Sequence, residues 1–162
     1  MLLSRSNMRD TIQYRFAQNT DIPVIVELLD KDGLPSTDVH KNEIQLLVAL
    51  TGNTIIGCIG LEIYERDGLL RSFAVAPDFR NQGIGSGLLN RLLQLAQQKE
   101  TNTLHLLTTS AESYFKKKGF KRTTRETAPA AIAATTEFTF LCPASACYMY
   151  YEIPSILFQE TP

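Results

Sequence analysis

The apolar positions of the chain follow two periods, and the change of period predicts where strands and helices alternate. Residues 84–98 place apolar side chains three or four positions apart, which is typical of one face of an amphipathic helix. Short apolar or alternating runs bounded by turn residues predict strands. The predicted strands are residues 12–17, 44–50, 54–64, 69–75, 103–108, 120–124 and 147–153. The predicted helices are one between Thr20 or Asp21 and Gly33, and residues 84–98, 111–118 and 129–140.

This order of elements predicts an α/β fold. Turns at residues 51–53 and 66–68 join three consecutive strands into an antiparallel meander. We therefore expect a mixed, mostly antiparallel central sheet flanked by helices. Gly57 and Gly60 inside the middle strand of the meander indicate a bulge or a close approach of another part of the chain.

Composition narrows the possible functions. A chain of 162 residues with 44% hydrophobic and 20% charged residues is globular, and we expect one domain at residues 11–162 after a flexible N-terminal extension at residues 1–10. The net charge of −1 and the lack of a basic patch argue against nucleic acid as a partner. Three cysteines without a CxxC pair and only two histidines argue against a disulfide framework and a metal site. No long apolar segment occurs, so we expect no signal peptide, no membrane partner and a cytoplasmic location.

A glycine-bearing loop joins the strand at residues 69–75 to the helix at residues 84–98. The first backbone N–H groups of a helix have no acceptor inside the helix and lie at the positive end of its dipole. The loop therefore predicts an anion site, most often one for phosphate. The spacing of Gly83, Gly85 and Gly87 fits neither the P-loop pattern nor the dinucleotide-binding pattern. The alternative is a tight strand-to-helix turn whose glycines serve packing alone.

Two short motifs resemble the signatures of the GNAT N-acetyltransferase family. Residues 80–85 (RNQGIG) resemble the loop with which this family binds the pyrophosphate of acetyl-CoA. Residues 111–120 (AESYFKKKGF) resemble the second signature, on a helix beside the cofactor thiol. The resemblance implies the GNAT fold and acetyl-CoA as the cofactor. The cofactor-binding residues that it implies are Phe73, Ala74, Val75, Arg80, Asn81, Gln82, Gly83, Ile84, Gly85, Ser86 and Phe115.

The resemblance also implies catalytic roles. The backbone N–H of Val75, at the end of the central strand, is expected to polarise the thioester carbonyl. At the position of the tyrosine that often protonates the leaving thiolate in the family, this chain has Phe115, and Tyr114 stands one residue earlier. That shift turns a side chain by about 100° around the helix. Tyr114 is therefore a candidate general acid, and a place in the core is its alternative.

Two charged residues in predicted strands are candidates for chemistry on the acceptor. Glu62, among apolar neighbours, is the candidate base for the acceptor amine, and a solvent-facing position is its alternative. Arg71 lies in the central strand, where a buried arginine requires an anion. That anion is either a carboxylate of the acceptor or a structural partner, Glu62 or Glu65. By the period of two, Arg71 is expected to share a face with Phe73 and Val75.

Further contacts with the acceptor are expected outside the strands. In the GNAT fold the loop at residues 33–41 packs over the acceptor site, so Leu34 and Pro35 are candidates to line it. An ordinary connecting loop is the alternative. Ser145 and Arg125 are candidates for a second contact with an acceptor carboxylate.

Longer stretches narrow the resemblance. Residues 60–62 (GLE), residues 69–72 (LLRS) and the tail at residues 128–146 together resemble the arsenic-resistance subfamily of GNAT enzymes. Members of that subfamily acetylate, or are assumed to acetylate, the α-amine of arsinothricin, an arsenic-bearing analogue of glutamate. The tail also resembles short bacterial N-acetylglutamate synthases. Within the tail, Cys142 before a proline is expected to be structural.

The resemblance thus implies an N-acetyltransferase. It would move the acetyl group of acetyl-CoA directly to the primary amine of a small, amino-acid-like acceptor such as a glutamate analogue. The alternatives are an enzyme like N-acetylglutamate synthase, a protein or peptide acetyltransferase, and a catalytically idle acyl-CoA-binding domain with a regulatory role. The expected partner is a small-molecule amine, and a homodimer is left open.

Overall fold

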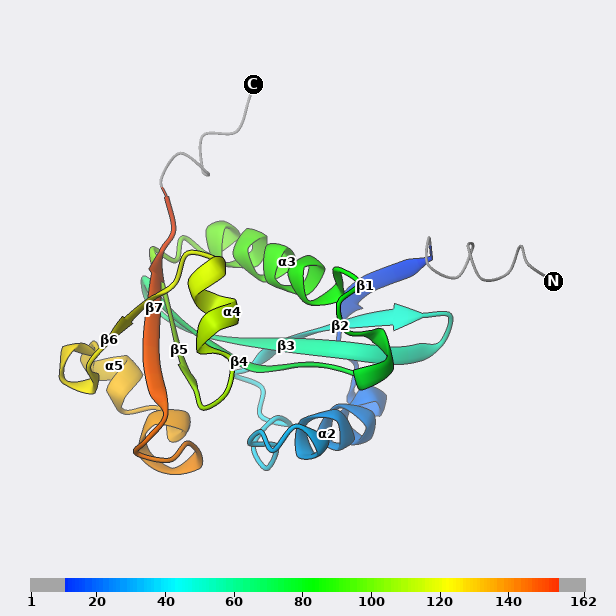
Figure 1. Ribbon diagram of the computed structural model, residues 1–162, viewed down its shortest axis with the longest axis horizontal. Coiled ribbons are helices and arrows are strands. Elements are labelled where there is room, and N and C mark those ends of the chain that lie inside the picture. Colours follow the sequence, from blue (N-terminus) through cyan, green and yellow to red (C-terminus); the bar gives the residue numbers. More distant parts are fainter. Residues whose placement is uncertain (1–10, 155–162) are drawn as a thin grey trace, which may run out of the picture. The chain divides into compact units, whose positions relative to one another are not determined.

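Figure 1 shows the computed structural model, which describes residues 11–154, so the extension expected at residues 1–10 lies outside the described part. The described residues form the strands β1 (Ile12–Phe16), β2 (Gln45–Thr51), β3 (Thr54–Tyr64), β4 (Asp67–Val75), β5 (Thr103–Thr108), β6 (Lys121–Thr123) and β7 (Cys147–Glu152). These strands join into one sheet in the order β1-β2-β3-β4-β5-β7-β6. β4 and β5 are parallel, whereas β1 and β2, β5 and β7, and β6 and β7 are antiparallel. The predicted α/β fold with a mixed, mostly antiparallel sheet is confirmed.

The helices of the described residues follow the predicted order, with one error. They are α2 (Ile22–Lys31), α3 (Ile84–Gln98), α4 (Glu112–Lys117) and α5 (Ala130–Ala133). The single helix predicted over residues 129–140 is wrong, because α5 is only one turn long and a separate π-helical turn follows at Glu137–Leu141. Thr135 explains the break. Its N–H and its hydroxyl both donate to the carbonyl of Ile132, at 3.1 and 2.7 Å, and such side-chain bonds compete with the helical pattern.

The chain packs as two compact units. Among the described residues, the first unit contains residues 11–60 together with Ser72–Leu92, and the second contains Leu61–Arg71 together with residues 93–154. In the first unit, the buried face of α2 joins apolar side chains of β2 and β3 in one cluster, with Ile25 and Val48 both at 0% exposure. α2 and the beginning of α3 lie on opposite sides of the strands of this unit (Figure 1).

Two glycines bring α3 close to its neighbours in the first unit. A Cβ at Gly57 of β3 would lie only 3.1 Å from Cδ1 of Leu88, so the close approach predicted for this glycine is confirmed. A Cβ at Gly87 would overlap the hydroxyl of Tyr14 on β1. The ring of Tyr14 lies 3.8 Å below the guanidinium of Arg91, one turn further along α3.

The core of the second unit connects the sheet to the C-terminal segment. Leu69 of β4 and Tyr148 of β7 form a buried cluster with Ile132 of α5 and Phe138 of the π-helical turn. The half-buried Tyr64, at the end of β3, packs against this cluster. We refer to Leu69, Ile132, Phe138 and Tyr148 as the tail cluster.

Candidate active site

In the first unit, the loop after β4 has the backbone of an anion site. Pro77–Phe79 forms a 3-10 turn, and α3 begins at Ile84. Asn81 and Gly83 have φ angles of 63° and 83°, in the left-handed region. Left-handed residues among ordinary ones turn successive N–H groups toward one side, and such a concave group of N–H donors binds anions. A Cβ at Gly83 would meet nothing within 4 Å, so this position favours glycine for its conformation and not for space.

The accessibility of the loop fits a phosphate-bearing cofactor. Residues 81–83 are exposed and residues 85–86 are half-buried, whereas Ile84 packs into the core. The first backbone bond of the helix runs from the N–H of Gly87 to the carbonyl of Gly83, at 3.0 Å. Because this bond is the first of the helix, the N–H groups of Ile84 and Gly85 have no acceptor inside it. Any contact of Ile84 with a cofactor therefore comes from its backbone.

Arg80 ties this loop to two other parts of the first unit. Its Nε donates to the carbonyl of Val75 at 2.9 Å, and its Nη2 lies 2.5 Å from Oδ1 of Asp32, just after α2. The side chain of Arg80 is 46% exposed, so an anionic ligand can reach it. Sequence reasoning missed Asp32, because no pattern connects two residues 48 positions apart.

The end of β4 does not alternate regularly. Ser72 has a φ of 56°, which is a left-handed conformation inside a strand. Arg71 and Ser72 are both buried, and Phe73 and Val75 are half-buried. Because a left-handed residue interrupts the alternation of side chains, the period-of-two argument that placed Arg71 on one face with Phe73 and Val75 does not hold across Ser72.

The second unit contains a buried carboxylate held from two directions. Nη1 of Arg71 donates to Oε2 of Glu62 at 2.7 Å, and the two side chains are only 0% and 8% exposed. The hydroxyl of Tyr64 donates to the other oxygen, Oε1. Glu62 is therefore not a solvent-facing residue, and of the anions expected for Arg71 the structure supplies Glu62. Tyr64 was missed, although the period of two on β3 places it on the same face as Glu62.

This arrangement satisfies the conditions under which a buried ion pair persists. Removing two charges from water is costly, and attraction between them compensates only when further hydrogen bonds satisfy the remaining polar atoms. The bond from Tyr64 meets that condition for Glu62. The result is a carboxylate that is largely desolvated and held in one orientation.

On α4, the two neighbouring aromatic residues have different surroundings. Phe115 is 5% exposed and packs edge to face on Phe120, with ring centroids 5.3 Å apart. Tyr114 is half-buried, and the ammonium of Lys118 lies 5.5 Å from its ring centroid. Phe115 is thus the core residue of the pair, whereas Tyr114 is half-buried with its hydroxyl oxygen buried.

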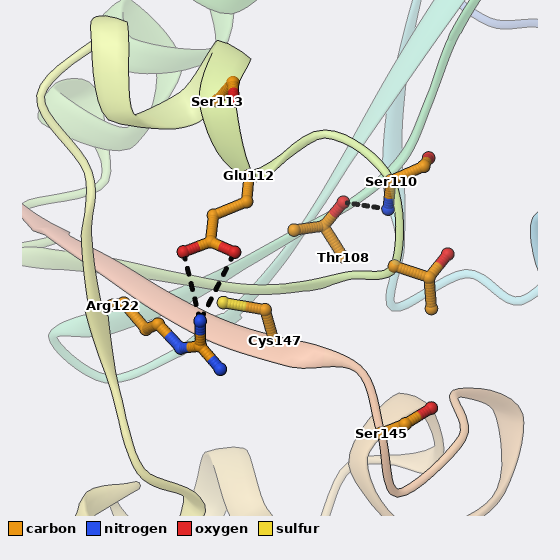
Figure 2. Close-up of a pocket in the computed structure, with 8 residues that line it drawn as sticks. Thr108, Ser110, Glu112, Ser113, Arg122, Ser145 and Cys147 are labelled. Atoms are coloured by element: carbon orange, nitrogen blue, oxygen red, sulfur yellow. Dashed lines mark hydrogen bonds and ion pairs between the residues drawn. The ribbon is translucent and has the colours of Figure 1, made fainter.

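A polar pocket opens beside α4 in the second unit (Figure 2), with an empty volume of about 540 Å³ that includes its mouth. Glu112 and Arg122 face each other across it, with Nη1 3.4 and 3.5 Å from the two carboxylate oxygens. Ser145, predicted as an acceptor contact, is exposed and lines this pocket. The lining residues are Thr108, Thr109, Ser110, Glu112, Ser113, Arg122, Ser145 and Cys147. Glu62 and Arg71 are not among them.

Arg125 and Cys142 both have structural contacts near the π-helical turn. Arg125 donates to the carbonyl of Phe138 within the turn and to that of Pro143 just after it, at 3.2 and 2.7 Å. The Cys142 thiol lies 3.6 and 3.8 Å from the carboxylate oxygens of Glu137. Burial, with the negative charge of Glu137, raises the pKa of Cys142 to about 12. A thiol that stays protonated is a poor nucleophile, which supports the structural role predicted for Cys142.

The loop after α2 contains the two candidates for lining the acceptor site. Leu34 packs against the core of the first unit, and its N–H donates to the carbonyl of Leu29 at 2.9 Å. Pro35 is half-buried. A role of Leu34 and Pro35 in contacting an acceptor stays a prediction.

A family model described as the acetyltransferase (GNAT) domain matches residues 42–122, which is half of the chain. The chain belongs to the GNAT acetyltransferase family. The matched stretch includes both GNAT motifs and the Glu62–Arg71 pair. The predicted acetyltransferase class and its cofactor, acetyl-CoA, are therefore confirmed, and the predicted domain bounds, residues 11–162, stay a prediction.

Individual relatives place this GNAT chain near amino-acid acetyltransferases. The chain is 34% identical over 129 residues to an amino-acid acetyltransferase of Ectopseudomonas mendocina, which covers 74% of this chain and 30% of the relative. The fold is similar to that of N-acetylglutamate synthase from Neisseria gonorrhoeae complexed with coenzyme A and N-acetyl-glutamate, with a TM-score of 0.76, 19% identity and coverage of 88% of this chain and 35% of that one. This chain thus spans about a third of the length of these relatives.

A second solved structure is matched over nearly its whole length. It is a Mycobacterium tuberculosis protein in complex with CoA, with a TM-score of 0.72, 21% identity and coverage of 88% of this chain and 99% of that one. Within residues 11–154 of the present chain, no helix combines the length and the apolar character that crossing a bilayer requires.

Proposed function

We propose that this GNAT domain transfers the acetyl group of acetyl-CoA to the α-amine of a free amino acid of the glutamate type. The observation that carries the proposal is Glu62, a carboxylate that is 8% exposed and hydrogen-bonded at both oxygens. A fixed, desolvated carboxylate suits a base that takes a proton from an amine, directly or through one water.

The choice of acceptor rests on the relatives. The sequence relative is named an amino-acid acetyltransferase, and one of the structural neighbours contains N-acetyl-glutamate. These names favour the alternative of an enzyme like N-acetylglutamate synthase over arsinothricin acetylation, for which no relative described above gives support. Both acceptors present an α-amine and two acidic groups, so they belong to one chemical class, and an assay separates them.

The chemistry requires one bond to form and one to break. Bound acetyl-CoA supplies a thioester, whose carbonyl carbon forms a C–N bond with the amine while its C–S bond breaks and leaves the electron pair on sulfur. Glu62 takes one proton from the acceptor ammonium and releases it to solvent. The Tyr114 hydroxyl is the proposed donor of a proton to the sulfur, and the second proton, which leaves the nitrogen as the amide forms, restores that hydroxyl. A thiol pKa of about 8.5 makes this last protonation helpful but not essential.

The cofactor is proposed to lie on the loop of the first unit. The N–H groups of residues 82–86 suit the pyrophosphate, because they combine a left-handed turn with the positive end of α3. Arg80 would add charge, since it is exposed and its partner Asp32 can be replaced by a phosphate. The backbone N–H of Val75 is the proposed donor to the thioester carbonyl, and Phe73 and Ala74 would contact the cofactor through their backbone.

Arg71 enters the proposal as the partner of Glu62. Its side chain is 0% exposed, so the pair with Glu62 is the role that its surroundings support best. That Arg71 and Ser145 bind a carboxylate of the acceptor stays a prediction.

The test is release of free thiol from acetyl-CoA with glutamate, arsinothricin, the other free amino acids and a lysine peptide as acceptors. We expect turnover with glutamate-type acceptors, and a loss of at least about 100-fold in kcat for Glu62→Gln with the KM for acetyl-CoA unchanged. Turnover with the peptide alone would refute the proposal. Binding of acetyl-CoA without turnover of any amine would instead support the idle binding domain.

A further inference from the structure

The C-terminal segment of this chain is the stretch whose role the GNAT motifs do not explain. Its residues 128–146 lie outside the stretch that the GNAT family model matches, and α5 and the π-helical turn contribute Ile132 and Phe138 to the core. Ile132 and Phe138, at 0% and 8% exposure, complete the tail cluster with Leu69 and Tyr148.

The tail cluster supports Tyr64, and Tyr64 reaches Glu62. The ring of Tyr64 packs against the cluster, while its hydroxyl donates to Oε1 of Glu62. Tyr64 and Glu62 are two positions apart on β3, so both side chains project from the same face of the strand. The segment with the unexplained motif is thus connected to the proposed base through one phenol.

A second hydrogen bond changes what the carboxylate of Glu62 can do. The last torsion of a glutamate side chain is broad, so one partner alone leaves the carboxylate plane free to rotate. Arg71 holds Oε2 at 2.7 Å, and Tyr64 holds Oε1. With both oxygens fixed, the plane of the carboxylate and the direction of its remaining lone pairs are fixed as well.

The tail cluster is itself held firmly. The ring of Phe138 packs edge to face on Tyr148, with centroids 5.2 Å apart. Arg125 donates to the carbonyl of Phe138 at 3.2 Å, and its guanidinium carbon lies 5.6 Å from the ring centroid of Phe138. Tyr64 therefore packs against side chains that have few alternative conformations.

We propose that Tyr64 is a positioning residue, which holds the Glu62 carboxylate in the orientation for proton transfer, and that the tail cluster fixes Tyr64 for this purpose. This inference rests on the proposed function. It assigns to the C-terminal segment a part in the reaction without any contact with the acceptor.

The test compares two tyrosines of the same region. Tyr64→Phe keeps the ring on the tail cluster and removes the hydroxyl from Glu62. Tyr148→Phe is the matched control, because Tyr148 belongs to the cluster but its hydroxyl is hydrogen-bonded to Nδ1 of His105, at 2.8 Å, and not to Glu62. Both variants are assayed for kcat, for the KM of acetyl-CoA and for Tm.

For Tyr64→Phe we expect kcat to fall about tenfold with the KM for acetyl-CoA unchanged. For Tyr148→Phe we expect a lower Tm, with kcat within about twofold of the wild type. Phe138→Leu, which loosens the support of Tyr64, should lower kcat in the same direction by a smaller factor.

Each outcome has a distinct meaning. Wild-type kcat in Tyr64→Phe would overturn the positioning role while the proposed function stands. Equal losses of kcat in Tyr64→Phe and Tyr148→Phe would also overturn it, because stability alone would then explain both. A wild-type protein without turnover of any amine would refute the proposed function, and the inference with it.

Discussion

Two arginine–carboxylate pairs, one in each unit, have the same chemistry and opposite surroundings. Arg80 and Asp32 in the first unit are 46% and 26% exposed and lie 2.5 Å apart. Arg71 and Glu62 in the second unit are 0% and 8% exposed and lie 2.7 Å apart. Distance alone does not separate the pairs, and burial does.

The difference teaches which pair can change partners. An exposed pair contributes about 0–1 kcal/mol, so Arg80 can leave Asp32 for a phosphate at little cost. Breaking a buried pair costs about 3–5 kcal/mol, so Arg71 stays with Glu62. In the proposed cofactor loop, Arg80 can thus exchange its partner, whereas Arg71 remains paired with the proposed base.

The largest effect is expected from breaking the buried pair. Arg71→Met leaves the Glu62 carboxylate buried without a cation, so the free energy of unfolding should fall by about 3–5 kcal/mol. Urea denaturation measures it. Arg80→Met is the matched control, with an expected change within about 1 kcal/mol. Equal losses in the two variants would contradict the contrast between the pairs.

The next effect concerns the backbone of the loop. Gly83→Ala places a side chain at a φ of 83°, which costs about 1–2 kcal/mol in the left-handed region and favours another loop conformation. We expect the KM for acetyl-CoA to rise about tenfold with kcat nearly unchanged. Gly52→Ala is the control, since Gly52 has a φ of 61° and equally open surroundings but lies in the β2–β3 turn. A rise in KM in both variants would show that the loop has no special part in cofactor binding.

The smallest effect is expected at a third pair of intermediate exposure. A hydrogen bond from Arg15 holds the pKa of Asp21 below its usual value of 3.8. The folded state therefore gains stability from this group above about pH 4, and that gain is lost as the pH falls through the lowered pKa. Asp21→Asn should lower Tm at about pH 6 by a degree or two, and the difference from the wild type should shrink toward about pH 3. A difference that is independent of pH would mean that the charge of Asp21 is irrelevant.

The sequence predicted the elements best where turns are marked by glycine. The strand at residues 54–64 was predicted with its observed bounds, because Gly52, with its φ of 61°, marks the turn before it. The prediction of one helix over residues 129–140 was wrong, because the hydroxyl of Thr135 donates to the carbonyl of Ile132. Helix propensities do not describe this competition between a side-chain hydrogen bond and the helical backbone bonds.

The cofactor loop and the surroundings of Glu62 also differed in how well the sequence predicted them. The loop at residues 80–86 could be located because its chemistry lies in the backbone, which glycines report directly. The surroundings of Glu62 could be narrowed to Arg71 or solvent, but not resolved, because side-chain partners depend on tertiary packing. The hydrogen bond from Tyr64 to Glu62 could have been predicted from the sequence, because the period of two places both residues on one face of β3. No sequence pattern indicated that Arg80 would pair with Asp32.

The contact between Gly87 and Tyr14 has a consequence for how this sequence can change over evolutionary time. Because a Cβ at position 87 would overlap the hydroxyl of Tyr14, a side chain there requires Tyr14 either to move or to be replaced by a smaller residue. Either change disturbs the contact between the ring of Tyr14 and Arg91. Among related sequences, we therefore expect a smaller residue at position 14 more often where position 87 is not glycine, which is a covariation signal that links the first strand to the helix of the cofactor loop.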